Sequence, residues 1–138
     1  MKPPTGPYER VRLTTSSLAD LDEIHDRSID ALREVFRRLR QLDRGEITPI
    51  PLQDFAKTGD LSDCSKIVVE TADGPEYRIV VRESGGIYDV VDVVVVEART
   101  EDLAYLLAGI RLGRIHDPIR KSDAQRRIDR IRNRLDRP

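Results

Sequence analysis

The stretch that decides the fold is residues 66–98, which read KIVVETADGPEYRIVVRESGGIYDVVDVVVVEA. Three runs rich in Val, Ile and Tyr are separated here by two turn signals, Ala72-Asp73-Gly74-Pro75 and Ser84-Gly85-Gly86. Runs of this composition between Gly-containing turns are typical of antiparallel strands. We therefore predict a β-meander with strands over 66–71, over 76–82 and within 88–98, and the valine-rich centre of the last strand indicates burial on both faces.

Two helices are predicted before this meander. The stronger one keeps apolar residues at helical spacing over four turns, and Gly45 then stops it; these residues are Ile29, Leu32, Phe36, Leu39 and Leu42. Its arginines lie mostly off this apolar stripe: Arg33, Arg37, Arg38 and Arg40. A shorter helix capped by Ser16 or Ser17 precedes it, so the two form an αα-hairpin. A strand over 9–14 comes first, and residues 52–60 are expected to be irregular.

Two more helices are predicted after the meander. Thr100 can cap the first, whose apolar face is Leu103, Leu106, Leu107 and Ile110 and which ends at Gly113. The last helix covers roughly 122–135 and carries one apolar seam among many arginines: Ala124, Ile128, Ile131 and Leu135. This seam is compatible with packing on the body, with pairing in a homodimer, and with a helix that lies on RNA.

The expected architecture is an α+β domain in the order β-α-α-β-β-β-α, followed by a basic helix. A small antiparallel sheet packs on the N-terminal helical hairpin. We divide the chain into a flexible leader over 1–8, a domain over 9–114 and a basic helical extension over 115–138.

Composition narrows the class of protein. The 138 residues suffice for one core, with 38% hydrophobic and 36% charged residues and no Trp. A single Cys excludes an internal disulfide and fits a reducing cytoplasm, where we expect the protein to act. The N-terminus has no apolar segment typical of a secretory signal, and the run from Val93 to Val96 is too short to span a bilayer. We expect no membrane association.

The charge is distributed unevenly along the chain. Residues 111–138 carry 10 Arg or Lys and 4 Asp, a net charge of +6, which leaves −7 for residues 1–110. This asymmetry indicates that the C-terminal segment binds something acidic, either nucleic acid or the body of the protein itself.

Strand parity brings the candidate site residues together. Tyr77, Ile79 and Val81 share one face of their strand, and Arg78 points to the other. If the Ile/Val faces are buried on the helical hairpin, Lys66 and Arg78 project together from the open face of the sheet. Arg99 follows the third strand and Tyr105 lies in the next helix, so the four can converge on one surface. Cations clustered in this way suit a bound phosphate.

The ordered set of motifs resembles a known family. Residues 61–67, Leu-Ser-Asp-Cys-Ser-Lys-Ile, are followed by Tyr77-Arg78-Ile79-Val80, then by Arg99 and, six positions later, Tyr105. This combination resembles the RelE branch of the RelE/ParE toxin superfamily, over roughly residues 9–113. The resemblance implies a toxin of a type II toxin–antitoxin system, which is a ribosome-dependent mRNA endoribonuclease that uses no metal or other cofactor. Its implied partners are a cognate antitoxin and mRNA in the ribosomal A site.

The resemblance also implies roles for individual residues. Arg78 would stabilise the charge on the scissile phosphate, and Arg99 would protonate the leaving 5′ oxygen or hold the phosphate. Tyr105 would position or deprotonate the attacking 2′-hydroxyl, with help from Lys66. A tyrosine, with an ordinary pKa of ~10, is a poor base at neutral pH unless cations stabilise its phenolate. We add three residues as RNA- or phosphate-binding cations: Arg82, Arg111 and Arg114.

Other interpretations of the same residues stay open. Val68 stands where a second lysine is common in the RelE pattern, which favours a non-catalytic binding module or a ParE-like gyrase inhibitor. Arg78 and Arg82 are also compatible with solvated strand residues paired with Glu70 or Glu76. Cys64 is expected to be a small buried residue, and neither His25 nor His116 has metal-ligand spacing.

Overall fold

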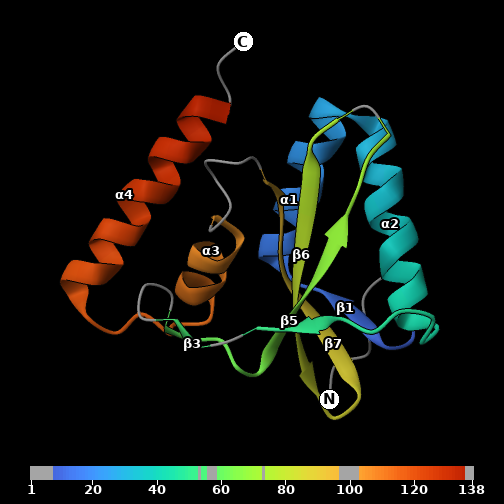
Figure 1. Cartoon of the computed structure of the whole chain (residues 1–138), viewed down its shortest axis with the longest axis horizontal. Helices are drawn as coiled ribbons and strands as arrows, with labels where there is room; N and C mark the ends of the chain where they lie inside the picture. The colour runs from blue at the N-terminus through green and yellow to red at the C-terminus, as the bar shows by residue number, and fades with distance from the viewer. Residues whose placement is uncertain (1–7, 53, 56–58, 73, 97–102, 136–138) are drawn as a thin grey trace.

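The computed structural model describes residues 8–52, 54–55, 59–72, 74–96 and 103–135, and Figure 1 shows their arrangement. Seven strands and four helices follow one another in this part of the chain. In chain order they are β1 (Val11–Leu13), α1 (Thr15–Arg27), α2 (Ile29–Asp43), β2 (Ile50–Pro51), β3 (Asp54–Phe55), β4 (Gly59–Asp60), β5 (Cys64–Val69), β6 (Glu76–Ser84), β7 (Ile87–Val96), α3 (Leu103–Arg111) and α4 (Pro118–Leu135).

The predicted α+β class and the three-stranded meander are confirmed, but the sheet is larger and mixed. Five strands lie in the order β1-β7-β6-β5-β2, and β1 runs parallel to β7 while the other pairs are antiparallel. The expectation of a purely antiparallel sheet was therefore wrong. Residues 52–60, expected to be irregular, contain the two short strands β3 and β4, which pair only with each other.

The helical hairpin forms because two hydroxyl side chains cap its helices. Thr14 accepts a bond from the backbone N–H of Ser17, and Ser17 accepts one from the N–H of Thr14, which completes a capping box. The N-cap is therefore Thr14, and the predicted caps at Ser16 or Ser17 were misplaced. Thr14 directly follows the end of β1 at Leu13, and its hydroxyl donates a 2.7 Å hydrogen bond to the carbonyl of Val90. Ser28 ends α1 and caps α2, where its hydroxyl accepts the backbone N–H of Ala31 at 3.2 Å.

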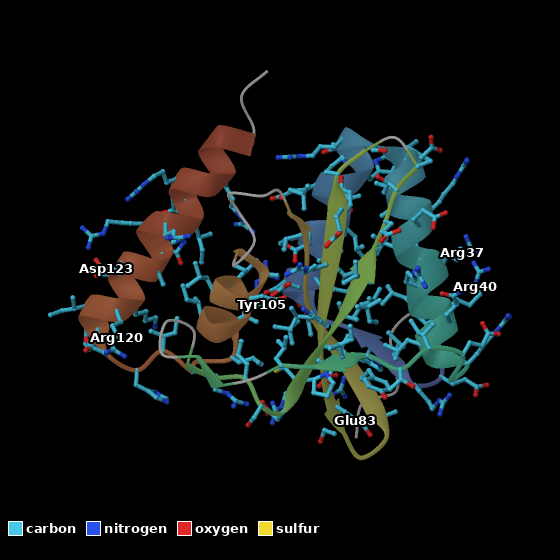
Figure 2. All side chains as sticks on the ribbon, viewed as in Figure 1. Arg37, Arg40, Glu83, Tyr105, Arg120 and Asp123 are labelled. Atoms are coloured by element: carbon cyan, nitrogen blue, oxygen red, sulfur yellow. The ribbon has the colours of Figure 1, made fainter. Side chains whose placement is uncertain are left out.

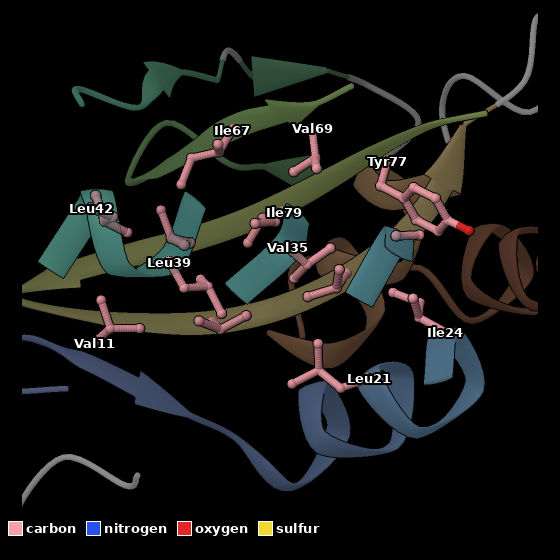
Figure 3. Packing of buried hydrophobic residues seen from close by; sticks show 14 of the residues in the cluster. Val11, Leu21, Ile24, Val35, Leu39, Leu42, Ile67, Val69, Tyr77 and Ile79 are labelled. Carbon is pink, nitrogen blue, oxygen red and sulfur yellow. The ribbon is translucent and has the colours of Figure 1, made fainter. Parts of the chain in front are cut away.

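Helices α1 and α2 bury one face of the sheet. Their apolar faces meet the side chains of β5, β6 and β7 that have the same parity, as Figure 3 shows for Leu39, Ile67 and Ile79. Burying each such aliphatic side chain contributes about 1.5–3 kcal/mol. The expected docking of the Ile/Val faces on the hairpin is confirmed.

The opposite face of the sheet is not open, contrary to our expectation. Helix α3 packs on β7 and β6, and α4 packs on α3, so the sheet lies between two helical layers (Figure 1). A second apolar core fills this side and contains Val80 and Val94 of the sheet together with Ala124 and Ile128 of α4. The described part of the α4 seam thus packs on the body, and the helix begins at Pro118 rather than near 122.

A β-bulge lies between β6 and β7 beside this second core. Val81 pairs with Val90 but Val80 pairs with Asp92, so Val91 is the extra residue. The pairing of β1 with β7 stops at Val90. Beyond that point the outer edge of β7 is covered by side chains instead of by a strand.

Candidate functional site

Three of the four predicted catalytic residues lie together between the sheet and α3. Nη1 of Arg78 donates a 2.6 Å hydrogen bond to the Tyr105 hydroxyl oxygen. The Arg78 guanidinium carbon lies 5.6 Å from the centre of the Tyr105 ring, and the Lys66 Nζ lies 5.9 Å from it. Two cations therefore flank one phenol, at distances where a cation attracts an aromatic ring. Arg99, the fourth residue, lies outside the described residues.

Strand register accounts for this convergence. Lys66 is opposite Val80 and Arg78 is opposite Val68, which makes Lys66 and Arg78 diagonal neighbours on one sheet face. Tyr105 is in the first turn of α3, which packs on the same face, and its place between α3 and the sheet is visible in Figure 2. Period-2 alternation alone therefore predicts that the two cations share a face.

The site is half-buried. Lys66 and Tyr105 are partly exposed, while the Arg78 side chain is only 12% exposed and its Nε lies 3.5 Å from a carboxylate oxygen of Glu76. Val68 directly opposes Arg78, so no second lysine stands on this strand face. Guanidinium and ammonium groups held in this way can stabilise negative charge on the phenol oxygen or on a phosphate bound beside it.

Two of the predicted phosphate-binding residues share one carboxylate at another place. Arg114 Nη2 donates to Asp63 at 2.7 Å, and the Arg82 Nε lies 3.1 Å from the same oxygen. Partial burial opposes ionisation of Asp63, but the hydrogen bond and charge of Arg114, with the charge of Arg82, hold its pKa below the ordinary value. These two arginines are therefore already engaged by an anionic group of the protein.

Arg111, the third predicted phosphate-binding residue, forms a buried ion pair. Its Nη1 and Nη2 donate to the two carboxylate oxygens of Asp20, at 2.7 and 2.9 Å, and Nη1 also donates to the carbonyl of Val91. The same Asp20 accepts the backbone N–H of Val93 at 3.0 Å. This pair provides hydrogen-bond partners for the backbone groups of Val91 and Val93, where β7 extends beyond its pairing with β1. Arg132 of α4 also lies near Asp20, at 3.8 Å.

Arg82 and Arg111 both line a small pocket of about 150 Å³ near the start of α1.

Asp92 is a buried carboxyl that our sequence reasoning did not assign. Its side chain is fully buried, and neither oxygen has a hydrogen-bond partner among the described residues. Burial, and then the negative charge of Asp20, raise its pKa well above the ordinary value, against the opposing charges of Arg111 and Arg132. The signal in the sequence was an aspartate inside the valine run of the third strand, where a charged residue is costly.

The single cysteine is not a nucleophile at neutral pH. Cys64 is 1% exposed, as predicted for a small buried residue. Burial, together with the neighbouring Asp63 carboxylate, raises the pKa of its thiol to about 12. Within the described residues there is no group of three or more His, Cys, Asp or Glu side chains that could hold a metal ion.

No protein-family model, curated protein or solved structure matches this chain. In the part of the chain that the structure describes, no helix has both the length and the apolar character needed to cross a membrane.

Proposed function

We propose that the protein is a RelE-like toxin of a type II toxin–antitoxin system, acting in the cytoplasm as a metal-independent, ribosome-dependent mRNA endoribonuclease. One observation carries this proposal: Arg78 donates to the Tyr105 hydroxyl at 2.6 Å while Lys66 lies over the same ring. The RelE resemblance assigns catalytic roles to these three residues, which come from two strands and a helix.

The proposed reaction is cleavage of a phosphodiester by the adjacent 2′-hydroxyl. The 2′ oxygen attacks phosphorus and loses its proton, the bond to the 5′ oxygen breaks, and the leaving oxygen gains a proton. Tyr105 would orient or deprotonate the 2′-hydroxyl, and Arg78 would stabilise the additional negative charge on the phosphate. Lys66 would bind the backbone beside them, and Arg99 would supply the proton or hold the phosphate.

The helical layer over this face suggests how an antitoxin would act. α3 and α4 already pack on the side of the sheet that carries Lys66 and Arg78. An antitoxin segment would lie over this basic face or take the place of α4. A homodimer through the α4 seam would compete with the packing of Ala124 and Ile128 in the second core.

A second function, a non-catalytic binding module or a ParE-like gyrase inhibitor, is favoured by a different observation. Each of Arg82, Arg111 and Arg114 lies against a carboxylate of the protein itself. Val68 also occupies the strand position opposite Arg78. In this alternative the Arg78–Tyr105 bond holds α3 on the sheet and has no catalytic role.

The test is induction of the protein in a bacterial host, with growth and mRNA 5′ ends followed together. The variant Tyr105→Phe removes only the hydroxyl that Arg78 contacts. Tyr77→Phe is its matched control, because Tyr77 is 3% exposed in the first core on the opposite face of the sheet. Growth arrest with new cuts in coding regions, lost in Tyr105→Phe and kept in Tyr77→Phe, would support the nuclease.

Other outcomes point to the alternatives. Arrest with intact mRNA would favour inhibition of gyrase. Absence of arrest, with folded protein present, would favour a non-toxic binding module and would contradict the nuclease proposal.

A further inference from the structure

Helix α2, together with its C-cap residue Arg44, presents a row of arginines that the proposed site does not use. Four arginines are spaced by 4, 3 and 4 residues and all are exposed; they are Arg33, Arg37, Arg40 and Arg44. We call these four residues the α2 arginine row. Figure 2 shows Arg37 and Arg40 on the side of α2 that points away from the sheet.

This spacing forms one straight line of charge. Residues separated by 4, 3 and 4 positions stay on one helix face, and the eleven steps between the first and the last arginine extend about 16 Å along the axis. The buried residues of α2, which include Val35 and Leu39, lie on the opposite side and anchor the helix in the first core. The α2 arginine row is therefore held on a rigid element and faces solvent along its whole length.

The charge of this row is only partly neutralised by the protein. Arg33 lies 3.8 Å from Asp30 and Arg37 lies 3.7 Å from Glu34, both at exposed positions where such pairs contribute little. Among the described residues, Arg40 and Arg44 form no ion pair. The nearby Asp43 carboxylate accepts the backbone N–H of Arg10 and is not ion-paired with Arg40 or Arg44 among the described residues. The C-terminal half of the row thus carries positive charge on a body whose net charge is negative.

The chemistry of the row selects a phosphate backbone as its ligand. Guanidinium groups match phosphate oxygens with paired donors. No aromatic residue of α2 is fully exposed for stacking on bases, because Phe36, its only aromatic, is packed against the first core. A protein interface would need an apolar centre, which the row lacks.

We infer that the α2 arginine row binds the phosphate backbone of double-helical RNA, without reading its sequence. The phosphate-binding chemistry rests on α2 alone, whereas the choice of RNA over DNA rests on the proposed function. Helix α2 and Tyr105 lie on opposite faces of the sheet. RNA held on α2 therefore does not itself cover the Lys66, Arg78 and Tyr105 site.

The test is equilibrium binding of a fluorescently labelled RNA duplex, followed by anisotropy across a series of KCl concentrations. Each phosphate contact contributes about −0.9 to the slope of log K against log salt for duplex nucleic acid, so four contacts give a slope of roughly −3.6. Arg40→Gln/Arg44→Gln should reduce this slope by about 1.8, and should weaken binding roughly 60-fold at 0.1 M salt. Circular dichroism would establish that the variant is folded.

Arg126→Gln/Arg130→Gln is the matched control, because it removes the same charge from two exposed positions of α4. The inference predicts that this control retains the wild-type slope. An equal loss in the control would overturn the inference, and so would a wild-type slope near zero. Tighter binding to a DNA duplex or to polyglutamate than to the RNA duplex would also overturn it.

The binding assay contains no ribosome and measures no cleavage. A failure of binding therefore leaves the cleavage experiment intact, and a failure of cleavage leaves the binding result intact.

Discussion

Replacing Asp92 with valine should stabilise the protein at neutral pH. The carboxyl is fully buried in a valine-rich strand, and both of its oxygens lack a hydrogen-bond partner among the described residues. Leaving a buried polar group unsatisfied costs about 1–3 kcal/mol, and valine, the residue that fills most of this strand, has no polar side-chain atom. The Arg111 guanidinium keeps its two bonds to Asp20, so Asp92→Val leaves that arginine paired.

The expected gain is therefore about 1–3 kcal/mol, and each 1 kcal/mol corresponds to a rise of roughly 3–4 °C in Tm for a domain of this size. The gain should depend on pH. Because burial raises the pKa of Asp92, the folded state favours the protonated carboxyl. This preference contributes its full stabilisation to the wild type below pH ~3.9, the pKa of an aspartate in the unfolded chain. The contribution is lost as the pH rises through the higher pKa that Asp92 has in the folded protein. The advantage of Asp92→Val should thus be larger at pH 8 than at pH 4.

Urea unfolding of wild type and variant, followed by circular dichroism at both pH values, measures this difference. Asp92→Asn is the control: it removes the titration but keeps a buried polar group, so its advantage at pH 8 should be smaller. A variant less stable than wild type by 1 kcal/mol or more at pH 8 would refute the reasoning, because Asp92 would then have a stabilising partner. A gain of equal size at both pH values would refute the part that concerns ionisation.

Three further predictions concern the buried pair, the thiol and α4. Arg111→Gln leaves the Asp20 charge buried without its guanidinium and should cost about 3–5 kcal/mol in urea unfolding; a loss below 1 kcal/mol would show that the pair is dispensable. Since the pKa of the Cys64 thiol is raised to about 12, the native protein should react slowly with a disulfide reagent at pH 8 and rapidly once unfolded in urea; rapid native labelling would contradict this. Ile128→Ala should cost about 2–5 kcal/mol because Ile128 is fully buried, whereas Ile119→Ala, at a position 72% exposed, should change stability by less than about 0.5 kcal/mol; similar effects of the two would mean that α4 does not pack as described.

The sequence predicted the parts of the fold that depend on local pattern. Alternation placed Lys66 and Arg78 on one face, and helical spacing identified α2 through Leu39 and Leu42 of its buried side. The predicted stripe missed Val35, which is fully buried, and wrongly included Ile29, which is 51% exposed. It did not predict that α3 and α4 cover the face that carries the site. That arrangement depends on the packing of α3 on Val80 and Val94 and of α4 on α3 in the second core, which no local period encodes.

The same limit applies to the charged residues. Arg111 and Asp20 are 91 positions apart, and Arg114 and Asp63 are 51 apart. Sequence alone indicates that such arginines are cations, but it cannot show that a carboxylate of the same chain already binds them. The unassigned Asp92 illustrates the same point, because only the bulge between β6 and β7 turns its side chain into the second core.

The parallel pairing of β1 with β7 has a consequence for synthesis of the protein. Arg12 pairs with Asp89, so the sheet cannot close until about two-thirds of the chain has been translated. Pairing of such distant segments must overcome a large loss of chain entropy, which slows folding. During translation the helical hairpin is synthesised before the meander, so its apolar face stays uncovered until the meander has been made. The nascent chain would thus carry no assembled Lys66, Arg78 and Tyr105 site until α3, which holds Tyr105, has also been translated.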